Sequence, residues 1–176
     1  MENEQARTIE ILQLAVRMEE DGKEFYQKAS RKSSNKLAKE LFRQLANEED
    51  VHRKKFEEIY KALKRGQNWP DVKPPSEKGE KIKSLFAEAT KALGSKFKVA
   101  ESEFEAIKIA MDMEVRSYNL YYSRSKEGTL PVEKRFYQTL AGEERGHHLA
   151  LLDSYEYLSD PAGWFTKKEH WSLDGA

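Results

Sequence analysis

The sequence repeats itself at a fixed offset of 95 residues, and this repeat limits what the chain can fold into. Glu19 corresponds to Glu114 and Glu49 corresponds to Glu144, with no gap between the two matches. The other matched pairs are Glu10 with Glu105, Ala15 with Ala110, Met18 with Met113, Tyr26 with Tyr121, Leu45 with Leu140, Ala46 with Ala141, Glu48 with Glu143, His52 with His147 and Tyr60 with Tyr155. The chain therefore contains two copies of one structural unit.

Each copy has the pattern of two consecutive amphipathic helices, because apolar residues recur at three- and four-residue spacings. A helical hairpin cannot bury its apolar stripe alone, so the two copies should pack against each other. We therefore predict an all-α four-helix bundle made of two repeated hairpins with a long crossover connection. The hairpins are expected over about residues 4–65 and 101–159.

Local signals mark where the helices begin. Ser33-Ser34-Asn35 offers capping groups for the second helix. Ser102 with Glu105 has the spacing of a capping box at the start of the third helix. Pro131 suits the first turn of the fourth helix, just after a break at Gly128.

The remaining segments are a connector and a tail. Residues 66–100 join the two hairpins, with a glycine- and proline-rich start and a short helix predicted over about residues 77–93. One domain is predicted over residues 1–160. Residues 161–176 form a C-terminal aromatic tail, which contains Trp164, Phe165, His170 and Trp171.

Composition excludes several classes of function. The 31 basic residues balance the 31 acidic residues, so no charge excess indicates a nucleic acid or a membrane surface as partner. Cysteine is absent, which excludes disulfides, cysteine-bound zinc and iron–sulfur clusters from these residues. No secretory signal or apolar span is visible, and we expect a cytoplasmic protein.

Four glutamates are predicted to lie at one level of the bundle. Residues of antiparallel helices are level when the turn lies midway between them. The midpoint of Glu19 and Glu49 is Ser34, and that of the matched pair in the second copy is Thr129. Each glutamate is thus about 15 residues, or roughly 22 Å, from its turn. We expect all four in the middle of the bundle.

The same four glutamates lie on apolar faces. His52 follows Glu49 by three residues and His147 follows Glu144 by three, so each histidine shares a helix face with a glutamate. Four buried carboxylates would repel one another, whereas two divalent cations would cancel their charge. Carboxylates with imidazoles suit iron or manganese. The predicted metal ligands are Glu19, Glu49, His52, Glu114, Glu144 and His147.

Other interpretations of these residues stay open from the sequence. The six predicted ligands could be buried ion pairs or a hydrated helix face, although no matching cations share their faces. Tyr26 and Tyr121 could donate hydrogen bonds to carboxylates across the bundle, relay an electron, or only pack. The acidic neighbours about 100° round the helices are expected to contact the ligands or to be solvated. These neighbours are Glu20, Glu48, Asp50 and Glu143.

Four segments resemble the rubrerythrin branch of the ferritin-like superfamily. They are residues 17–26, 46–52, 113–122 and 141–147. The resemblance implies a ferritin-like bundle with two iron ions, in which Glu49 and Glu144 bridge and the other four predicted ligands are terminal. Manganese or zinc could take the place of iron. The resemblance also implies that the reduced centre reduces hydrogen peroxide or dioxygen, with electrons from an external donor protein. It further implies that the protein is a homodimer.

The sequence departs from the family pattern at two points. It has no cysteine, so it contains no rubredoxin-like iron–cysteine domain. Ser117 stands where rubrerythrins have an additional glutamate one turn after the third-helix ligand. Two other functions stay open: iron oxidation for storage, and a non-catalytic bundle with a structural metal.

Overall fold

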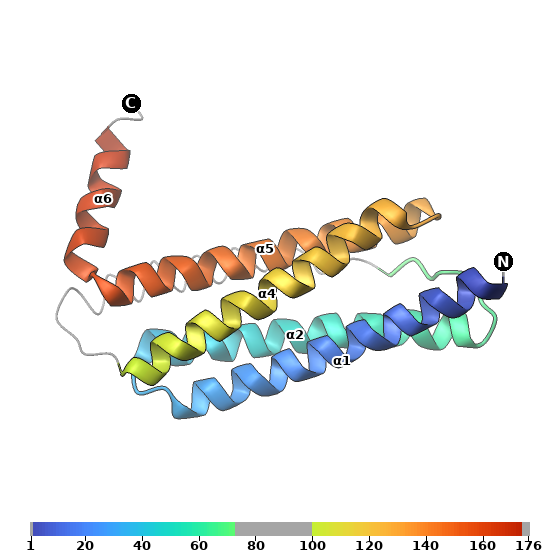
Figure 1. Cartoon of the computed structure of the whole chain (residues 1–176), viewed down its shortest axis with the longest axis horizontal. Helices are drawn as coiled ribbons and strands as arrows, with labels where there is room; N and C mark the ends of the chain where they lie inside the picture. The colour runs from blue at the N-terminus through green and yellow to red at the C-terminus, as the bar shows by residue number, and fades with distance from the viewer. Residues whose placement is uncertain (1, 73–99, 174–176) are drawn as a thin grey trace.

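The computed structural model describes residues 2–72 and 100–173, and within these ranges every regular element is a helix. The helices are α1 (Glu2–Lys32), α2 (Lys36–Lys64), α4 (Glu101–Glu127), α5 (Pro131–Ser159) and α6 (Pro161–Leu173) (Figure 1). The short helix predicted over about residues 77–93 lies outside the described residues. None of the described helices is long and apolar enough to span a membrane.

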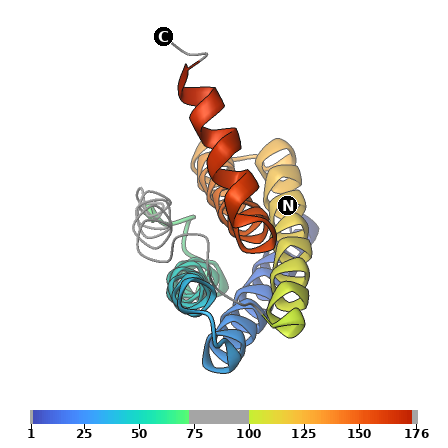
Figure 2. The same cartoon turned by 90° about the vertical axis from the view of Figure 1, so that its left-hand side faces the viewer.

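The four long helices form the predicted bundle of two hairpins. α1 runs antiparallel to α2, and α4 runs antiparallel to α5, with α1 and α4 adjacent along one side (Figures 1 and 2). The turn of the first hairpin is fixed by Asn35, whose side chain accepts hydrogen bonds from the backbone N–H groups of Leu37 and Ala38 at 2.9 and 3.2 Å. This confirms the predicted cap of the second helix.

The second hairpin also turns as predicted, but its first helix begins differently. α4 ends at Glu127, before Gly128, and α5 begins at Pro131. The predicted capping box of Ser102 and Glu105 is wrong, because α4 begins at Glu101 and both residues lie inside it. The spacing matched the motif, but the N–H groups at this end take a different acceptor.

That acceptor is the buried carboxylate of Glu103, which joins the ends of two helices. It accepts hydrogen bonds from the backbone N–H of Ala100 at 3.1 Å and of Asn35 at 2.9 Å. It also accepts a hydrogen bond from the hydroxyl of Ser34 at 3.2 Å. The start of α4 is thereby held against the turn between α1 and α2.

The apolar core is divided into two clusters along the bundle. One cluster lies toward the turn between α1 and α2 and includes Phe42, Ile107 and Leu151, each 0% exposed. The other lies toward the turn between α4 and α5 and includes Leu12 and Phe56, also 0% exposed. The level between the two clusters holds the buried charged residues described below.

The C-terminal segment predicted as an aromatic tail begins as helix α6. Its aromatic side chains pack on the end of the bundle, since the rings of Trp164 and Phe165 lie 5.4 and 5.9 Å from the ring of Tyr157. The side chain of His170 lies outside the described residues. α6 leaves the bundle beside the end of α5 (Figures 1 and 2).

We expect Glu103→Ala to lower the free energy of unfolding by about 1–3 kcal/mol, because it leaves buried N–H groups without an acceptor. Denaturant unfolding of the metal-free protein measures this. The matched control is Glu24→Ala, an exposed glutamate in the middle of α1, which should stay within about 0.5 kcal/mol of the wild type. Equal effects of the two substitutions would show that Glu103 does not connect the two helix ends.

Candidate metal centre

The structure brings all six predicted ligands into one buried cluster. The glutamates and histidines come from the four long helices, and their residues are between 1% and 4% exposed. Glu19 lies on α1, Glu49 and His52 on α2, Glu114 on α4, and Glu144 and His147 on α5. The cluster occupies the level between the two apolar core clusters, where the side chains are shielded from bulk solvent.

The six residues form two overlapping groups of four. One group consists of Glu19, Glu49, His52 and Glu144, and the other of Glu49, Glu114, Glu144 and His147. Within each group, one ligand atom per residue lies within 4.8 Å of the others. Each group contains three carboxylates and one imidazole, and each could hold a metal ion. Glu49 and Glu144 belong to both groups, as residues shared by two adjacent ions would.

The two histidines point the same ring atom into the cluster. Nδ1 of His52 lies 3.1 Å from Glu144 and 3.6 Å from Glu19. Nδ1 of His147 lies 3.4 Å from Glu114 and 3.5 Å from Glu144. The rings stack, with centroids 5.7 Å apart and planes inclined by 12°. Both imidazoles therefore present Nδ1 to the carboxylates from neighbouring positions.

The other ring nitrogen of each histidine, Nε2, contacts a glutamate. These glutamates, Glu48 and Glu143, directly precede Glu49 and Glu144 in the sequence. Nε2 of His52 lies 2.7 Å from Glu143 on α5, and Nε2 of His147 lies 2.8 Å from Glu48 on α2. Each hairpin thus supplies the residue that orients the histidine of the other. In the neutral imidazole, Nε2–H donates to the carboxylate and the lone pair of Nδ1 faces the cluster, where a metal ion could take the place of a proton.

The orienting role of Glu48 and Glu143 was not predicted from the sequence. Both residues were expected only to contact the ligands or to be solvated, like Glu20 and Asp50. The only sign of this role in the sequence was that the repeat matches Glu48 with Glu143. The contact itself crosses from one hairpin to the other, so spacing along a helix could not reveal it. Asp50 instead pairs with Lys23 on α1 at 2.7 Å and with Lys54 on α2 at 2.7 Å.

Tyr26 and Tyr121 each donate a hydrogen bond to a predicted ligand on the other hairpin, Glu114 or Glu19, which we call the outer glutamates. The hydroxyl of Tyr26 on α1 donates to Glu114 on α4, and the hydroxyl of Tyr121 on α4 donates to Glu19 on α1. Both tyrosines are at most 1% exposed. The hydrogen bonds considered for these residues from the sequence are therefore present, and they join the two hairpins next to the cluster.

Without metal ions, the cluster must hold protons to limit its own repulsion. Burial, with the nearby carboxylates, raises the pKa of Glu49 well above its usual range and raises that of Glu114 to about 8. Burial opposes ionisation of Glu144 too, but the two histidines hold its pKa well below its usual range. Burial would lower the histidine pKa values, yet the negative charge of the carboxylates around each ring raises both pKa values well above the usual range.

Several atoms of the cluster are buried without a hydrogen bond. They are Nδ1 of His52, Nδ1 of His147, Oε2 of Glu114 and Oε1 of Glu144. Buried polar atoms normally have partners, so these four call for a bound species at the centre of the cluster. Two divalent cations would supply four positive charges against four carboxylates. The donor set of carboxylate oxygens and imidazole nitrogens fits such ions.

The two halves differ one turn beyond the glutamates of α1 and α4. Ser117 on α4 corresponds to Gly22 on α1. A Cβ atom on Gly22 would lie 3.5 Å from Cγ and 3.7 Å from Oε2 of Glu49, so the backbone of α1 approaches this shared carboxylate closely. An alanine at position 22 would make ordinary van der Waals contact with Glu49, whereas a larger side chain would have to turn away from it.

Comparison with known proteins identifies one related family. The family model described as Rubrerythrin matches residues 10–155, which include the six residues of the cluster. No curated protein and no solved structure gives a match.

We expect metal binding to release protons at pH 7 and to strengthen as the pH rises from 6 to 8. The raised pKa values of Glu49, Glu114 and the two histidines mean that the metal-free cluster carries protons that the metal must displace. Calorimetric titration with Mn²⁺ in buffers of different ionisation enthalpy counts the protons. Binding that releases no protons and is independent of pH over this range would contradict the protonated state.

Proposed function

Because the chain belongs to the rubrerythrin family, we propose that its buried cluster holds two iron ions and reduces hydrogen peroxide or dioxygen. The observation that carries this proposal is the overlap of two four-residue groups in Glu49 and Glu144. Single ion pairs or one isolated metal would not need a second group with the same composition. Both groups are completed by repeat-related residues, Glu19 with His52 and Glu114 with His147.

When bound, the two ferrous ions would supply two electrons, which with two protons convert one hydrogen peroxide to two water molecules. The residues of the chain bind and orient the ions. Glu49 and Glu144, which belong to both groups of four, would bind both ions, and one histidine would complete each group. The four carboxylates would balance the four positive charges of the ferrous pair and would attract the more highly charged ferric pair still more strongly, so the ions should stay in the protein.

The surrounding residues keep this geometry fixed. Glu48 and Glu143 hold the Nε2–H groups of the histidines, which keeps the lone pair of Nδ1 directed inward. Tyr26 and Tyr121 restrict the outer glutamates through their hydroxyl groups. The apolar clusters on both sides exclude bulk water and strengthen the electrostatic interactions within the site.

We propose that the electrons come from an external donor protein, since these residues include no cysteine to bind a second iron centre of the rubredoxin kind. The residue at position 117 bears on which oxidant, hydrogen peroxide or dioxygen, the site would prefer. Ser117 provides no carboxylate at the position of the additional rubrerythrin glutamate, so we propose both oxidants as substrates.

Replacement of either histidine should have the same consequence. We expect His52→Ala and His147→Ala each to weaken metal binding by at least about tenfold, because even the residues that orient a ligand contribute 10–100-fold. Equilibrium titration with Mn²⁺ measures the metal affinity of both variants. His148→Ala, at the position next to His147, is the control and should keep the affinity of the wild type. Loss of affinity in only one variant would mean that the two halves do not bind equivalent ions.

The reaction should stop after one turnover without a reductant. Protein loaded with ferrous iron in the absence of oxygen should consume about one hydrogen peroxide per two-iron centre, followed by ferric absorbance. Further consumption should require an added reductant. Uptake of many irons per chain during repeated additions would instead support iron storage. Bound iron that neither oxidant oxidises would leave a structural metal site.

A further inference from the structure

Three aromatic rings lead from the metal centre toward the surface in the second half of the bundle. The hydroxyl of Tyr121 on α4 donates a hydrogen bond to Glu19, and the ring centroid of Tyr121 lies 6.1 Å from that of Tyr137 on α5. The ring centroid of Tyr137 lies 6.0 Å from that of Trp69. Aromatic pairs in contact have centroid distances of about 4.5–7 Å. Tyr121, Tyr137 and Trp69 therefore form one continuous row, which we call the aromatic row.

Trp69 is the end of the aromatic row that lies nearest to solvent. It is 8% exposed, whereas Tyr121 and Tyr137 are both 0% exposed. It follows α2 in the chain, and the nearby residues Asn68 and Asp71 are exposed. A small molecule in solution can therefore come closer to Trp69 than to either tyrosine of the row.

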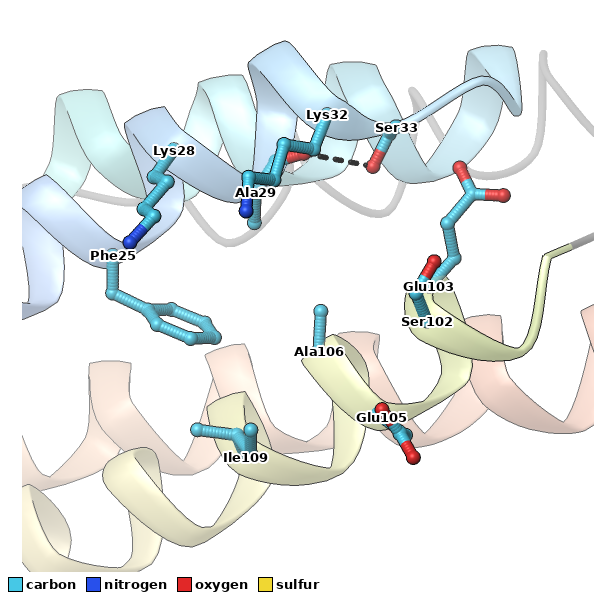
Figure 3. Close-up of a pocket in the computed structure, with 10 residues that line it drawn as sticks. All are labelled: Phe25, Lys28, Ala29, Lys32, Ser33, Ser102, Glu103, Glu105, Ala106 and Ile109. Atoms are coloured by element: carbon cyan, nitrogen blue, oxygen red, sulfur yellow. Dashed lines mark hydrogen bonds between the residues drawn. The ribbon is translucent and has the colours of Figure 1, made fainter.

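The first half of the bundle places phenylalanines behind its own tyrosine. Tyr26 is the repeat counterpart of Tyr121, and its ring lies 5.6 Å from that of Phe25, which points into a groove of about 260 Å³ between α1 and α4 (Figure 3). The ring of Tyr26 also lies 6.1 Å from that of Phe42, which corresponds to Tyr137 in the repeat. Phenylalanine is much harder to oxidise than tyrosine or tryptophan, because its ring carries no electron-donating oxygen or nitrogen. Among the described residues, the row of oxidisable rings therefore belongs to the second half.

We propose that the aromatic row carries single electrons from a small thiol in solution to dioxygen that is being reduced at the metal centre. This route rests on the function proposed above. Reduction of dioxygen to two water molecules takes four electrons and four protons, whereas the two ferrous ions supply two electrons. The aromatic row supplies the other two electrons, one at a time, so that the reduction proceeds to water instead of stopping at hydrogen peroxide.

Each passage moves one electron inward and leaves the three side chains as they began. Tyr121 gives an electron to the oxidant, and its phenolic proton shifts along the hydrogen bond to Glu19. Tyr137 and then Trp69 replace this electron, and the proton returns to Tyr121. The hydroxyl of Tyr137 is buried without a hydrogen bond, so no acceptor takes its proton and the radical does not stay there. A thiol then reduces Trp69. Two passages join two thiols as one disulfide and release two of the four protons, and the solvent supplies the other two.

The aromatic row can be tested in the metal-free protein by pulse radiolysis with azide radicals, which oxidise tryptophan. The chain has 3 tryptophans, so Trp164→Phe with Trp171→Phe leaves Trp69 as the tryptophan that is oxidised. We expect the absorbance of the tryptophan radical to decay while that of a tyrosyl radical rises, at a rate that does not depend on protein concentration. The electron then crosses the same row in the opposite direction.

Three further substitutions in this background identify the residues that take part. Tyr121→Phe should abolish the rise of the tyrosyl radical, because the hydroxyl that can release its proton is lost. Tyr137→Phe introduces the residue found at the matched position of the first half and should slow the transfer. Tyr26→Phe is the matched control, because it removes the equivalent hydrogen bond on the other half and should leave the rise in place. Equal tyrosyl yields in Tyr121→Phe and Tyr26→Phe, or a rate unchanged by Tyr137→Phe, would overturn the proposal.

Iron-loaded protein separates this route from the function on which it rests. When the ferrous protein is mixed with dioxygen and frozen rapidly, electron paramagnetic resonance should detect a tyrosyl radical that is lost in Tyr121→Phe. Added 2-mercaptoethanol should shorten the lifetime of this radical in the wild type and much less in Trp69→Phe. Iron oxidation without a radical would overturn the route and leave the proposed function standing. Ferrous iron that neither oxidant oxidises would overturn both.

Discussion

Four buried carboxylates at one level of a four-helix bundle are the constraint on which the rest of the structure depends. Burial penalises the charged form of a carboxyl group, and neighbouring carboxylates increase the penalty. The metal-free cluster responds by holding protons on Glu49 and Glu114. Its inward atoms still lack hydrogen bonds, including Nδ1 of both histidines. Two divalent cations would neutralise the carboxylates and give these inward atoms a partner, so we expect metal binding to stabilise the bundle.

The hydrogen bonds around the cluster connect the two hairpins to each other. Glu48 reaches the histidine of the second hairpin, and Glu143 reaches that of the first. In the same way, Tyr26 and Tyr121 each donate a hydrogen bond to a glutamate of the other hairpin. Each copy of the repeat is therefore incomplete without the other, and the site exists only in the assembled bundle. Glu103 adds a further connection between the hairpins at one end.

Much of this arrangement could be predicted from the sequence, for definable reasons. The fixed offset and the helical spacing of apolar residues predicted the bundle, and the midpoint argument predicted that Glu19 and Glu49 are level. The hydrogen bonds of Tyr26 and Tyr121 between the hairpins were among the possibilities, but two other contacts between hairpins were not predicted, because no spacing along the chain encodes them. The orienting role of Glu48 and the capping role of Glu103 belong to this class. The capping box at Ser102 was a local match, and the structure favours a different acceptor.

The most direct test of the account is the position of iron in crystals of the iron-loaded protein, located by anomalous scattering at the iron absorption edge. The account predicts two peaks per chain, both beside Glu49 and Glu144, with His52 at one and His147 at the other. A single peak per chain, or peaks away from these residues, would contradict the two-iron centre.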